Sequence, residues 1–525
     1  MHDLWICVCF LCSLLTVNCS VWVDRELTKR TTCEEQNVRI EREQTFTPCV
    51  FPPGERITVH LEHSTTDKQA VVYFLSDDTF GQIVFWLETT VDNNSIAFTV
   101  PHLNVVPGTW VRVHIQGKHT PESISGSFRI QTTALWAAVT IDGKFLGGIT
   151  HETLFSPIIT HEIPAEALPA HIVSSPDGRM WAIGQKNAEN VDANSTGIPL
   201  ILVSTIQPWN MWVLSNTGGL DSLGFLLPAD SEPMVVWSQH NQGQWRLVHA
   251  KVSMSGSTLF PMPVANMAPM DRPHRIRTSL SGIFIVQRSH LTSTENSQFL
   301  SLSPEMETST FSCTQAFGEE IPLTPFDVVP GKVIENGLAL FLSCISPVPE
   351  NNQYRVRTQW IVWNGQFQEA LSPSQELLVG SFPGKWHLPV LDPEIQGPAL
   401  LEPAVSHGIW TLFDLSQTNP IIPLSVTESQ TWNALFLDTQ TLLLYTPFQN
   451  TTSNGSLLVF RATHEWQSQI YFRNVRYMVP FVARQLLLAN PDQLIQSTLD
   501  EFLAGMPGFP VFGAACNVVN VQPQY

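Results

Sequence analysis

Residues 234–252, MVVWSQHNQGQWRLVHAKV, carry the pattern that decides the fold. Two apolar segments, MVVWSQ and WRLVHAKV, stand on either side of a short polar insertion. Short apolar runs bounded by polar turn residues are typical of buried β-strands. The stretch therefore predicts two neighbouring strands of a small sheet that is covered on both faces.

The same unit recurs along the chain from about residue 134 onward. Its leading apolar strands begin near Ala134, Met180, Met234, Ile283, Leu338, Ala399 and Thr441, at separations of 42 to 61 residues. A repeat of this length with three or four strands is typical of a β-propeller, in which each small sheet packs both faces on its neighbours. The pattern predicts a roughly seven-bladed β-propeller over residues 134–485, with six or eight blades as alternatives.

Residues 486–525 are predicted to form a short C-terminal helix and a tail. Asn490 precedes Pro491, Gln493 lies three residues beyond the expected cap, and Gly505 ends the pattern. The intervening apolar stripe consists of Leu494, Ile495, Leu499, Phe502 and Leu503. We expect an amphipathic helix that packs on the propeller.

Residues 30–133 predict a separate β-sandwich. Segments such as RITVHLEH and WVRVHIQG alternate apolar and polar residues. This alternation places one apolar face inward and one polar face outward in an antiparallel sheet. The fold class is therefore expected to be all-β throughout, with a sandwich followed by a propeller.

One order of motifs in this domain resembles a known family. NNSIAFTVP is followed by a turn at Pro107 and Gly108, then by WVRVHIQG and ISGSFRI. The order is similar to that in the Ig-like N-terminal domain of the Ser/Thr-rich GPI-anchored and fungal cell-wall β-glucan-synthesis (killer-toxin-resistance) family. The resemblance implies an Ig-like sandwich and a cell-wall setting. This chain departs from the family in having no Ser/Thr-rich stalk, and its polar end, NVVNVQPQY, predicts no GPI signal.

Residues 1–20 are predicted to be a cleaved signal peptide. The segment LWICVCFLCSLLTV at residues 4–17 has the length of a signal-peptide core and is too short to span a bilayer. We therefore expect a secreted, extracellular or cell-surface protein without a transmembrane segment after signal removal. Four Asn-x-Ser/Thr sequons predict glycosylation of Asn93, Asn194, Asn450 and Asn454.

Charge and cysteine spacing exclude several classes of function. The chain has 27 Lys and Arg against 46 Asp and Glu, a formal net charge of −19, which excludes a generic nucleic-acid binder. No cysteine has metal-ligand spacing. His151, His161 and His171 with Glu152 and Glu162 are predicted to form a surface cluster, with a divalent-cation site as the alternative, and no metal or cofactor is assigned. An oxidising compartment would allow disulfides between Cys33 and Cys49 and between Cys313 and Cys344, leaving Cys516 over.

The candidate binding residues are tryptophans in short polar contexts. The chain has 16 Trp, and Trp209, Trp212 and Trp363 are the best candidates for exposed rings. An exposed indole can stack on the apolar face of a sugar while nearby amides bind its hydroxyls. We expect these three residues to contact a carbohydrate.

Catalytic motifs are weaker. Arg272, Arg275 and Arg277 lie together in DRPHRIR and are predicted to form a solvated basic loop, although a sialidase-type Arg cluster is the alternative. Residues 174–181, SSPDGRMW, resemble a shortened Asp-box of the sialidase type, with a structural role. Glycoside hydrolysis needs two carboxylates at a defined separation, and Asp142 or Asp177 are candidates. No catalytic residue is assigned.

These observations leave three hypotheses for function. The first is a non-enzymatic binding or adhesion module for a carbohydrate or an extracellular protein. The second is a secreted propeller glycoside hydrolase of the sialidase type. The third is a structural scaffold or envelope protein.

Overall fold

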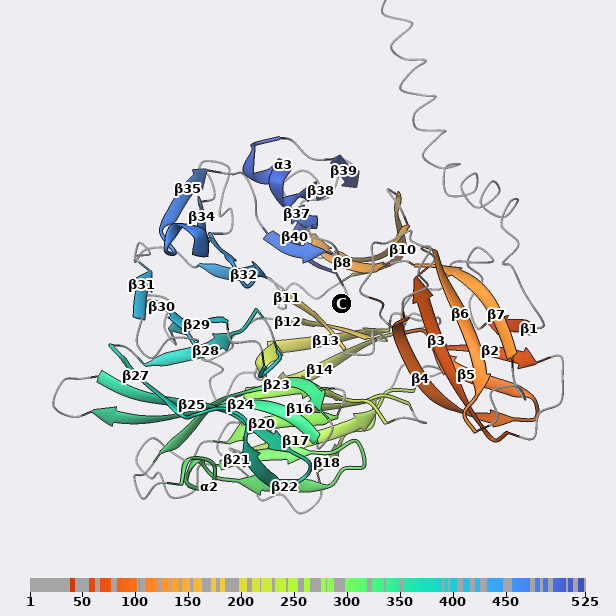
Figure 1. Ribbon diagram of the computed structural model, residues 1–525, viewed down its shortest axis with the longest axis horizontal. Helices are drawn as coiled ribbons and strands as arrows, with labels where there is room; N and C mark the ends of the chain where they lie inside the picture. The colour runs from red at the N-terminus through yellow and green to blue at the C-terminus, as the bar shows by residue number, and fades with distance from the viewer. Residues whose placement is uncertain are drawn as a thin grey trace, which may run out of the picture. The chain divides into compact units, whose positions relative to one another are not determined.

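The computed structural model shows an all-β protein (Figure 1). It describes residues 38–42, 56–61, 67–76, 83–101, 103, 110–119, 125–132, 134–140, 144–151, 154–162, 171–175, 180–184, 198–204, 210–217, 219–228, 232–241, 244–253, 259–264, 275–279, 281–287, 298–318, 323–334, 337–348, 353–380, 382–389, 391–394, 397–403, 409–415, 421–424, 432–446, 456–472, 477–481, 485–489, 494–506, 509–512 and 518–523. The chain divides into two compact units. The first contains Met1–Leu135 with Ile149–Ser156 and Tyr525, and the second contains Trp136–Gly148 and Pro157–Gln524.

The first unit contains a seven-stranded antiparallel sheet. Its strands are β1 (Val38–Arg42), β2 (Arg56–Leu61), β3 (Gln69–Ser76), β4 (Ile83–Asp92), β5 (Ser95–Thr99), β6 (Trp110–Gly117) and β7 (Ser125–Gln131), in the order β1-β2-β5-β4-β3-β6-β7. The long strand β4 pairs with β3 up to Thr90 and with β5 only through Val91 and Asp92. Strand β4 therefore joins two halves of the sheet, one containing β3, β6 and β7 and the other β2 and β5.

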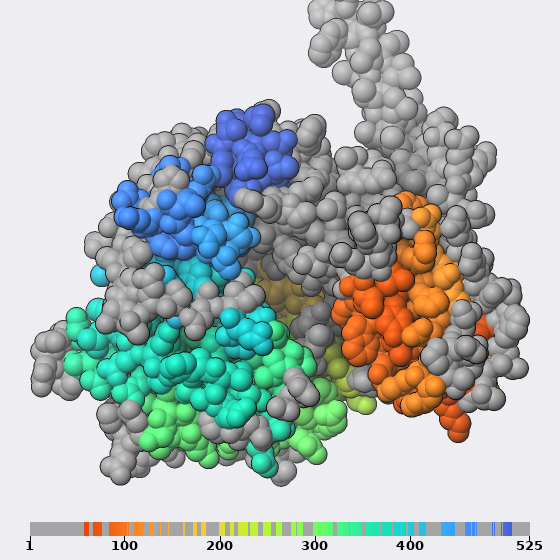
Figure 2. All heavy atoms as spheres, in the orientation of Figure 1, coloured from red at the N-terminus to blue at the C-terminus, as the bar shows by residue number. Residues whose placement is uncertain are grey.

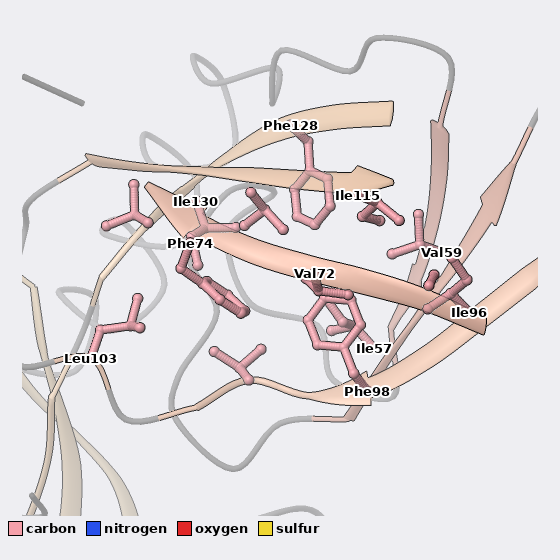
Figure 3. Packing of buried hydrophobic residues seen from close by; sticks show 14 residues of the cluster. Ile57, Val59, Val72, Phe74, Ile96, Phe98, Leu103, Ile115, Phe128 and Ile130 are labelled. Carbon is pink, nitrogen blue, oxygen red and sulfur yellow. The ribbon is translucent and has the colours of Figure 1, made fainter. Parts of the chain in front are cut away.

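The two halves enclose one apolar core, which Figure 3 shows from close by. Val72 and Phe74 of β3 lie opposite Phe98 of β5, and the Phe74 and Phe98 rings meet edge to face at 6.0 Å. Along β6 the buried residues alternate with more exposed ones, as the sequence predicts. The alternation follows from the two-residue period of a strand that has one face on a core.

The described residues that follow form a β-propeller of eight antiparallel sheets, called blades 1 to 8 below, which belong to the second unit apart from Ala134–Leu135 and the parts of blade 1 within Ile149–Ser156. Blade 1 contains β8 (Ala134–Thr140), β9 (Lys144–His151), β10 (Leu154–Glu162) and β40 (Val518–Pro523). Blade 2 contains β11 (His171–Ser174), β12 (Met180–Gly184), β13 (Ile198–Ser204) and β14 (Met211–Thr217). After the 3-10 helix η3 (Leu220–Ser222), blade 3 contains β15 (Leu223–Leu226), β16 (Met234–Asn241), β17 (Gln244–Lys251) and β18 (Met262–Pro263). Blade 4 contains β19 (Arg275–Ser279), β20 (Gly282–Gln287), β21 (Gln298–Leu302) and β22 (Thr308–Phe311), followed by helix α2 (Cys313–Phe317).

The remaining blades complete the series. Blade 5 has five strands, β23 (Thr324–Ile334), β24 (Gly337–Val348), β25 (Gln353–Trp363), β26 (Phe367–Ala370) and β27 (Gln375–Val379), the last pairing with β25. Blade 6 contains β28 (Pro383–His387), β29 (Pro398–Pro403), β30 (Trp410–Asp414) and β31 (Ile421–Leu424). Blade 7 contains β32 (Asn433–Asp438), β33 (Thr441–Tyr445), β34 (Ser456–Arg461) and β35 (Ser468–Phe472), with the 3-10 helix η5 (Ala462–His464) between the last two. Blade 8 contains β36 (Tyr477–Phe481), β37 (Gln485–Ala489), β38 (Leu494–Thr498) and β39 (Phe509–Phe512), with helix α3 (Leu499–Leu503) after β38.

The propeller is closed by strands from both ends of its sequence. Strand β40 pairs with β8, so three strands of blade 1 come from the start of the propeller and the fourth from its end. Strand β40 contacts β36 of blade 8 and β11 of blade 2. Figure 1 shows the sheets following one another in a ring. Shared strands of this kind prevent the first and last blades from separating and leave fewer free strand edges.

First strands of neighbouring blades contact one another around the ring, and in blade 1 strand β40 takes this place. Strand β15 contacts β19, β19 contacts β23, β23 contacts β28, and β32 contacts β36. Outside these strands, apolar clusters fill the spaces between successive blades. One cluster joins Trp212 of blade 2 to Trp237 of blade 3, and another joins Leu412 of blade 6 to Leu444 of blade 7. Clusters of this kind lie on both faces of blades 3 to 7.

The described residues form eight blades, one more than the predicted seven and equal to one of the two alternatives. The seven predicted starts correspond to the second strand of the sheets, and each of these strands is enclosed by strands on both sides. The missed blade is blade 8, whose second strand, β37, begins at Gln485. Gln485 is the predicted end of the propeller. The last two strands of blade 8, β38 and β39, therefore lie in the region predicted to contain the C-terminal helix and tail.

The predicted helix after Asn490 is wrong in its first part. Leu494–Thr498 is strand β38, which pairs with both β37 and β39. Helix α3 begins only at Leu499 and has its own cap: the Thr498 hydroxyl accepts from the Glu501 backbone N–H at 3.2 Å, and the Glu501 carboxylate accepts from the Thr498 N–H at 2.9 Å. Leu499 and Phe502 pack on the core of blades 7 and 8. A short apolar run beside Pro491 fits either a strand or a helix, and sheet pairing decides for the strand.

A disulfide joins blades 4 and 5. Cys313 in helix α2 is bonded to Cys344 on β24, with their Cα atoms 6.1 Å apart. This is one of the two pairings expected from the sequence. Cys33, Cys49 and Cys516 lie outside the described residues. No helix within the described ranges is long and apolar enough to cross a bilayer.

Candidate functional site

A buried carboxylate, that of Asp327, lies where blades 4, 5 and 6 meet. Asp327 is on β23, at an irregularity in the pairing of β23 with β24 between Pro325 and Asp327. Its side chain has no solvent exposure. Oδ1 accepts from the backbone N–H of Val328 at 3.0 Å. Oδ2 accepts from the backbone N–H of Trp386 on β28 at 2.9 Å.

Two arginines of blade 4 complete the surroundings of Asp327. Arg275 and Arg277 are two residues apart on β19 and point to the same side of the strand. Arg275 Nη1 lies 3.0 Å and Arg277 Nη2 lies 3.2 Å from Asp327 Oδ2. Arg275 Nη2 also donates to the Gly384 carbonyl of β28 at 2.6 Å. The first strands of three successive blades are thus tied together by one carboxylate and two guanidinium groups.

Electrostatics keep this group ionised. Burial raises the pKa of the Asp327 carboxyl, but the charges of Arg275 and Arg277 and the Trp386 N–H outweigh it and lower that pKa to about 2. Burial lowers the pKa of the Arg277 guanidinium, and the nearby carboxylates, first that of Asp327, outweigh it and raise that pKa. A paired, hydrogen-bonded ion cluster is the form in which charges persist in a protein interior.

The prediction of a solvated basic loop is therefore wrong for Arg275 and Arg277. They are strand residues, and Arg275 is only 6% exposed. Arg272 lies outside the described residues. The arginines do not form a sialidase-type anion site either, because both face Asp327. Their role is structural: they set the position of the neighbouring first strands.

A pocket of about 520 Å³ opens between blades 4 and 5. It is lined by Ser281, Phe284, Ser301, Leu302, Ser303, Pro304, Glu305, Glu307, Ser309, Val333, Ile334, Gly337, Leu338, Trp363, Asn364 and Gly365. These residues belong to the ends and connections of strands β19 to β26. Figure 2 shows the surfaces of blade 4 (bright green) and blade 5 (teal) lying directly beside each other.

The turn between β21 and β22 brings two carboxylates to this pocket. The Ser303 hydroxyl accepts from the backbone N–H of Glu305 at 3.2 Å and from that of Glu307 at 3.3 Å. Met306 between them has a positive φ of 69°. A serine that bonds to nearby backbone groups is typical of such turns. The turn presents Glu305 and Glu307 to the pocket, and both are exposed.

A glycine allows the opposite wall to form. Gly337 begins β24 with a φ of +148°, and a Cβ there would lie 2.4 Å from the Trp363 carbonyl oxygen. Only glycine combines this φ with such a close approach. The start of β24 therefore lies tightly against the end of β25, next to Trp363, Asn364 and Gly365 of the lining.

The two described tryptophans predicted to be exposed, Trp212 and Trp363, are buried. Trp212 is 3% exposed and lies in the core of blades 2 and 3, so its predicted carbohydrate contact is wrong. Trp363 is 6% exposed and packs on Phe311, with their rings 4.6 Å apart, but it also lines the pocket. Tryptophan on a blade strand serves packing first, because the spaces between blades need large side chains. Trp209 lies outside the described residues.

Other candidate residues are placed as follows. Asn93 is exposed at the turn between β4 and β5, where Asn93 and Asn94 have positive φ values of 47° and 61°. Positive φ at both central residues is the type I′ hairpin turn that asparagine favours. Outside the described residues lie Asn194, Asn450, Asn454, Asp142 and Asp177. In the Asp-box-like segment the Ser175 hydroxyl accepts from the Met180 N–H at 3.1 Å, a structural contact at a turn.

Sequence reasoning missed most of the pocket. Glu305, Glu307 and the lining serines come from blade 4, whereas Trp363 and Asn364 on the opposite wall come from blade 5, and no local motif links the two walls. The one signal is the segment SLSPEMETS at residues 301–309, a polar turn with two carboxylates between two strands. Among the described residues no group of three or more His, Cys, Asp or Glu is arranged to hold a metal ion.

Comparison with known proteins gives similarity of fold only. No family model matches the chain, and no curated protein does. A solved structure of a eukaryotic initiation factor is 11% identical with a TM-score of 0.39, covering 75% of this chain and 98% of that chain. The β-propeller domain of the Trilobed protease from Pyrococcus furiosus is 10% identical with a TM-score of 0.30, covering 64% and 91%. Sqt1 from Chaetomium thermophilum, bound to the N-terminus of the ribosomal protein L10, is 10% identical with a TM-score of 0.29, covering 60% and 93%. Similarity at this level assigns no function to the chain. The propeller architecture is established by the strand pairing described above.

Proposed function

We propose that this protein is a secreted or cell-surface glycoprotein that acts as a non-enzymatic binding module. Its propeller binds a carbohydrate or an extracellular protein at the pocket between blades 4 and 5. The observation that carries this proposal is the composition of the pocket lining, which brings together Trp363, Asn364 and several serines. Ligand pockets in proteins combine an apolar lining with a few convergent polar groups in this way.

The compartment is part of the same proposal. The apolar segment at residues 4–17 and the four sequons support secretion, and the disulfide between Cys313 and Cys344 fits an oxidising compartment. The exposed turn position of Asn93 suits a glycan. For the N-terminal unit, the shared core of its two half-sheets supports the Ig-like sandwich of the resembling cell-wall family. When expressed in a secreting eukaryotic cell, the protein should be found in the culture medium and should lose mass on deglycosylation. The mass lost should be smaller for Asn93→Gln than for wild type.

The binding proposal is tested with a matched pair of substitutions on β22. Ser309 lines the pocket, whereas Thr308 before it is exposed and outside the lining. Because successive strand residues point to opposite faces, Ser309→Trp fills the pocket and Thr308→Trp does not. The secreted chain is incubated with immobilised glycans, wall polysaccharides and basic and neutral peptides, and both retention and released sugar are measured. Retention by wild type and Thr308→Trp, with loss in Ser309→Trp, is the expected result, whereas equal retention by all three places the binding surface elsewhere.

A glycoside hydrolase is the second candidate, because Glu305 and Glu307 line one pocket. Two carboxylates are what such chemistry requires, but the catalytic acid is normally shielded from water, and both of these residues are exposed. Sugar release that disappears in Glu305→Gln or Glu307→Gln would favour the enzyme. Neither retention nor release, together with stable self-association, would favour a structural scaffold.

A further inference from the structure

The charge of the pocket between blades 4 and 5 restricts its ligand. Glu305 and Glu307 are both part of the lining, and no Lys, Arg or His is among the described residues that line it. The basic residue next to the lining along β23, Lys332, donates to the Asp392 carboxylate at 2.6 Å. A pocket with two carboxylates and no cation favours a positively charged group over a neutral or anionic one.

The apolar part of the lining restricts the ligand further. The lining also includes the apolar residues Phe284, Leu302, Leu338 and Trp363, beside the two carboxylates. Lys and Arg side chains have the matching shape, because an aliphatic stem of several methylenes carries a charged tip. Serine hydroxyls and the Asn364 amide oxygen can accept the hydrogens that a guanidinium or ammonium donates.

The size of the pocket and its rim indicate a protein segment and not a free amine. The volume of about 520 Å³ exceeds that of one long side chain. Val333, which also lines the pocket, is 64% exposed. An exposed apolar residue beside a charged pocket provides a contact for the residues that flank an inserted side chain.

We propose that this pocket binds a Lys or Arg side chain presented by a basic segment of an extracellular protein partner. The inference rests on the proposed binding function and narrows its ligand class. The acidic surface of the chain, with its formal net charge of −19, would speed the approach of such a partner, while the pocket would select the side chain.

The test uses fluorescent octalysine and octaarginine, with a neutral Ser-Gly octapeptide as the reference probe. Because any basic peptide is attracted to an acidic protein, the decisive comparison is between two double variants with the same change in net charge. Glu305→Gln/Glu307→Gln removes the pocket carboxylates, whereas Glu369→Gln/Glu465→Gln removes two exposed propeller carboxylates outside the lining. Affinity is measured by fluorescence anisotropy on the full secreted chain, and unfolding midpoints verify that each variant folds.

Binding of the basic probes should weaken at least about tenfold in the pocket variant and less than about twofold in the charge-matched variant. Equal weakening in both would overturn the proposal, because the attraction would then be a property of the whole surface. Absence of binding to wild type would also overturn it. A different result separates the two proposals. If wild type binds immobilised neutral glycans, Ser309→Trp does not bind them, and the basic probes bind neither protein, the proposed binding function stands and only the cationic ligand class fails.

Discussion

The carboxylate of Asp327 on β23 lies 3.0 Å from Nη1 of Arg275 on β19, and neither side chain is more than 8% exposed. The same carboxylate accepts from the Trp386 N–H of β28. One ion pair therefore fixes the distances among the first strands of blades 4, 5 and 6. In a propeller each blade packs only on its two neighbours. The ion pair and its hydrogen bonds therefore link three successive blades, whereas apolar packing links them only two at a time.

Asp327→Asn is expected to destabilise the propeller by about 3–5 kcal/mol, because it leaves the buried Arg275 guanidinium and the partly exposed Arg277 guanidinium facing a neutral amide. Denaturant unfolding monitored by tryptophan fluorescence measures this change. The control is Asp392→Asn, which removes an exposed ion pair with Lys332 and should leave the midpoint almost unchanged. Equal midpoints for Asp327→Asn and wild type would show that the buried pair does not stabilise the fold.

Acid should weaken the same contact in a defined range of pH. The pKa of Asp327 is lowered to about 2 in the folded state, below its ordinary value. A carboxyl with a lowered folded-state pKa stabilises the fold above its unfolded-state pKa, and that contribution falls between about pH 4 and about pH 2. The unfolding free energy of wild type should drop over this interval, and the drop should be smaller in Asp327→Asn. Parallel curves for the two proteins would contradict the assignment.

The propeller repeat was predictable because the second strand of a blade has strands on both sides and blades on both faces. Such strands are continuous apolar runs, for example Met180–Gly184, in which every residue is buried. The ion cluster was not predictable, since Asp327 follows Arg277 by 50 residues and only the ring brings blades 4 and 5 together. A pair of arginines in a polar segment looks the same in sequence whether it faces water or a buried carboxylate.

The pocket illustrates the same limit for function. Trp363 could be singled out from its polar context, but its low exposure comes from Phe311 of the neighbouring blade. Glu305 and Glu307 carry no motif, because their position depends on a turn closed by Ser303. Local sequence therefore predicts the blades, and the residues between blades depend on contacts that local sequence does not contain.

The disulfide between Cys313 and Cys344 should stabilise the propeller by about 2–4 kcal/mol, because it closes a loop across blades 4 and 5 with a sequence separation of 31 residues. Non-reducing peptide mapping should recover these two cysteines in one linked peptide. The double variant Cys313→Ser/Cys344→Ser should unfold at a lower denaturant concentration than the oxidised wild type. A linkage of either cysteine to Cys516 would contradict the pairing.

Trp212→Ala should cost about 3–5 kcal/mol of stability, because the ring is 3% exposed in the core of blades 2 and 3. The adjacent Val213 is 52% exposed, so Val213→Ala is the matched control and should change stability little. Thermal unfolding of both variants measures the difference. If Trp212→Ala kept its stability and lost glycan retention, the original prediction of an exposed sugar contact would be restored.

Gly282 is the residue at which the backbone most strictly requires glycine in blade 4. Its φ is +133°, and a Cβ there would lie 2.4 Å from the Leu302 carbonyl oxygen of the paired strand β21. Gly282→Ala must therefore move one of two paired strands, and we expect a loss of about 2 kcal/mol or more. Gly380→Ala is the control, since a Cβ at that position meets no atom within 4 Å, and its effect should stay within about 0.5 kcal/mol. Equal stability of the two variants would mean that the turn between β19 and β20 adopts another backbone conformation in solution.

The same substitution should affect binding, because Ser281 beside Gly282 lines the pocket between blades 4 and 5. Gly282→Ala should therefore weaken retention of the ligand by this pocket, whereas Gly380→Ala should not.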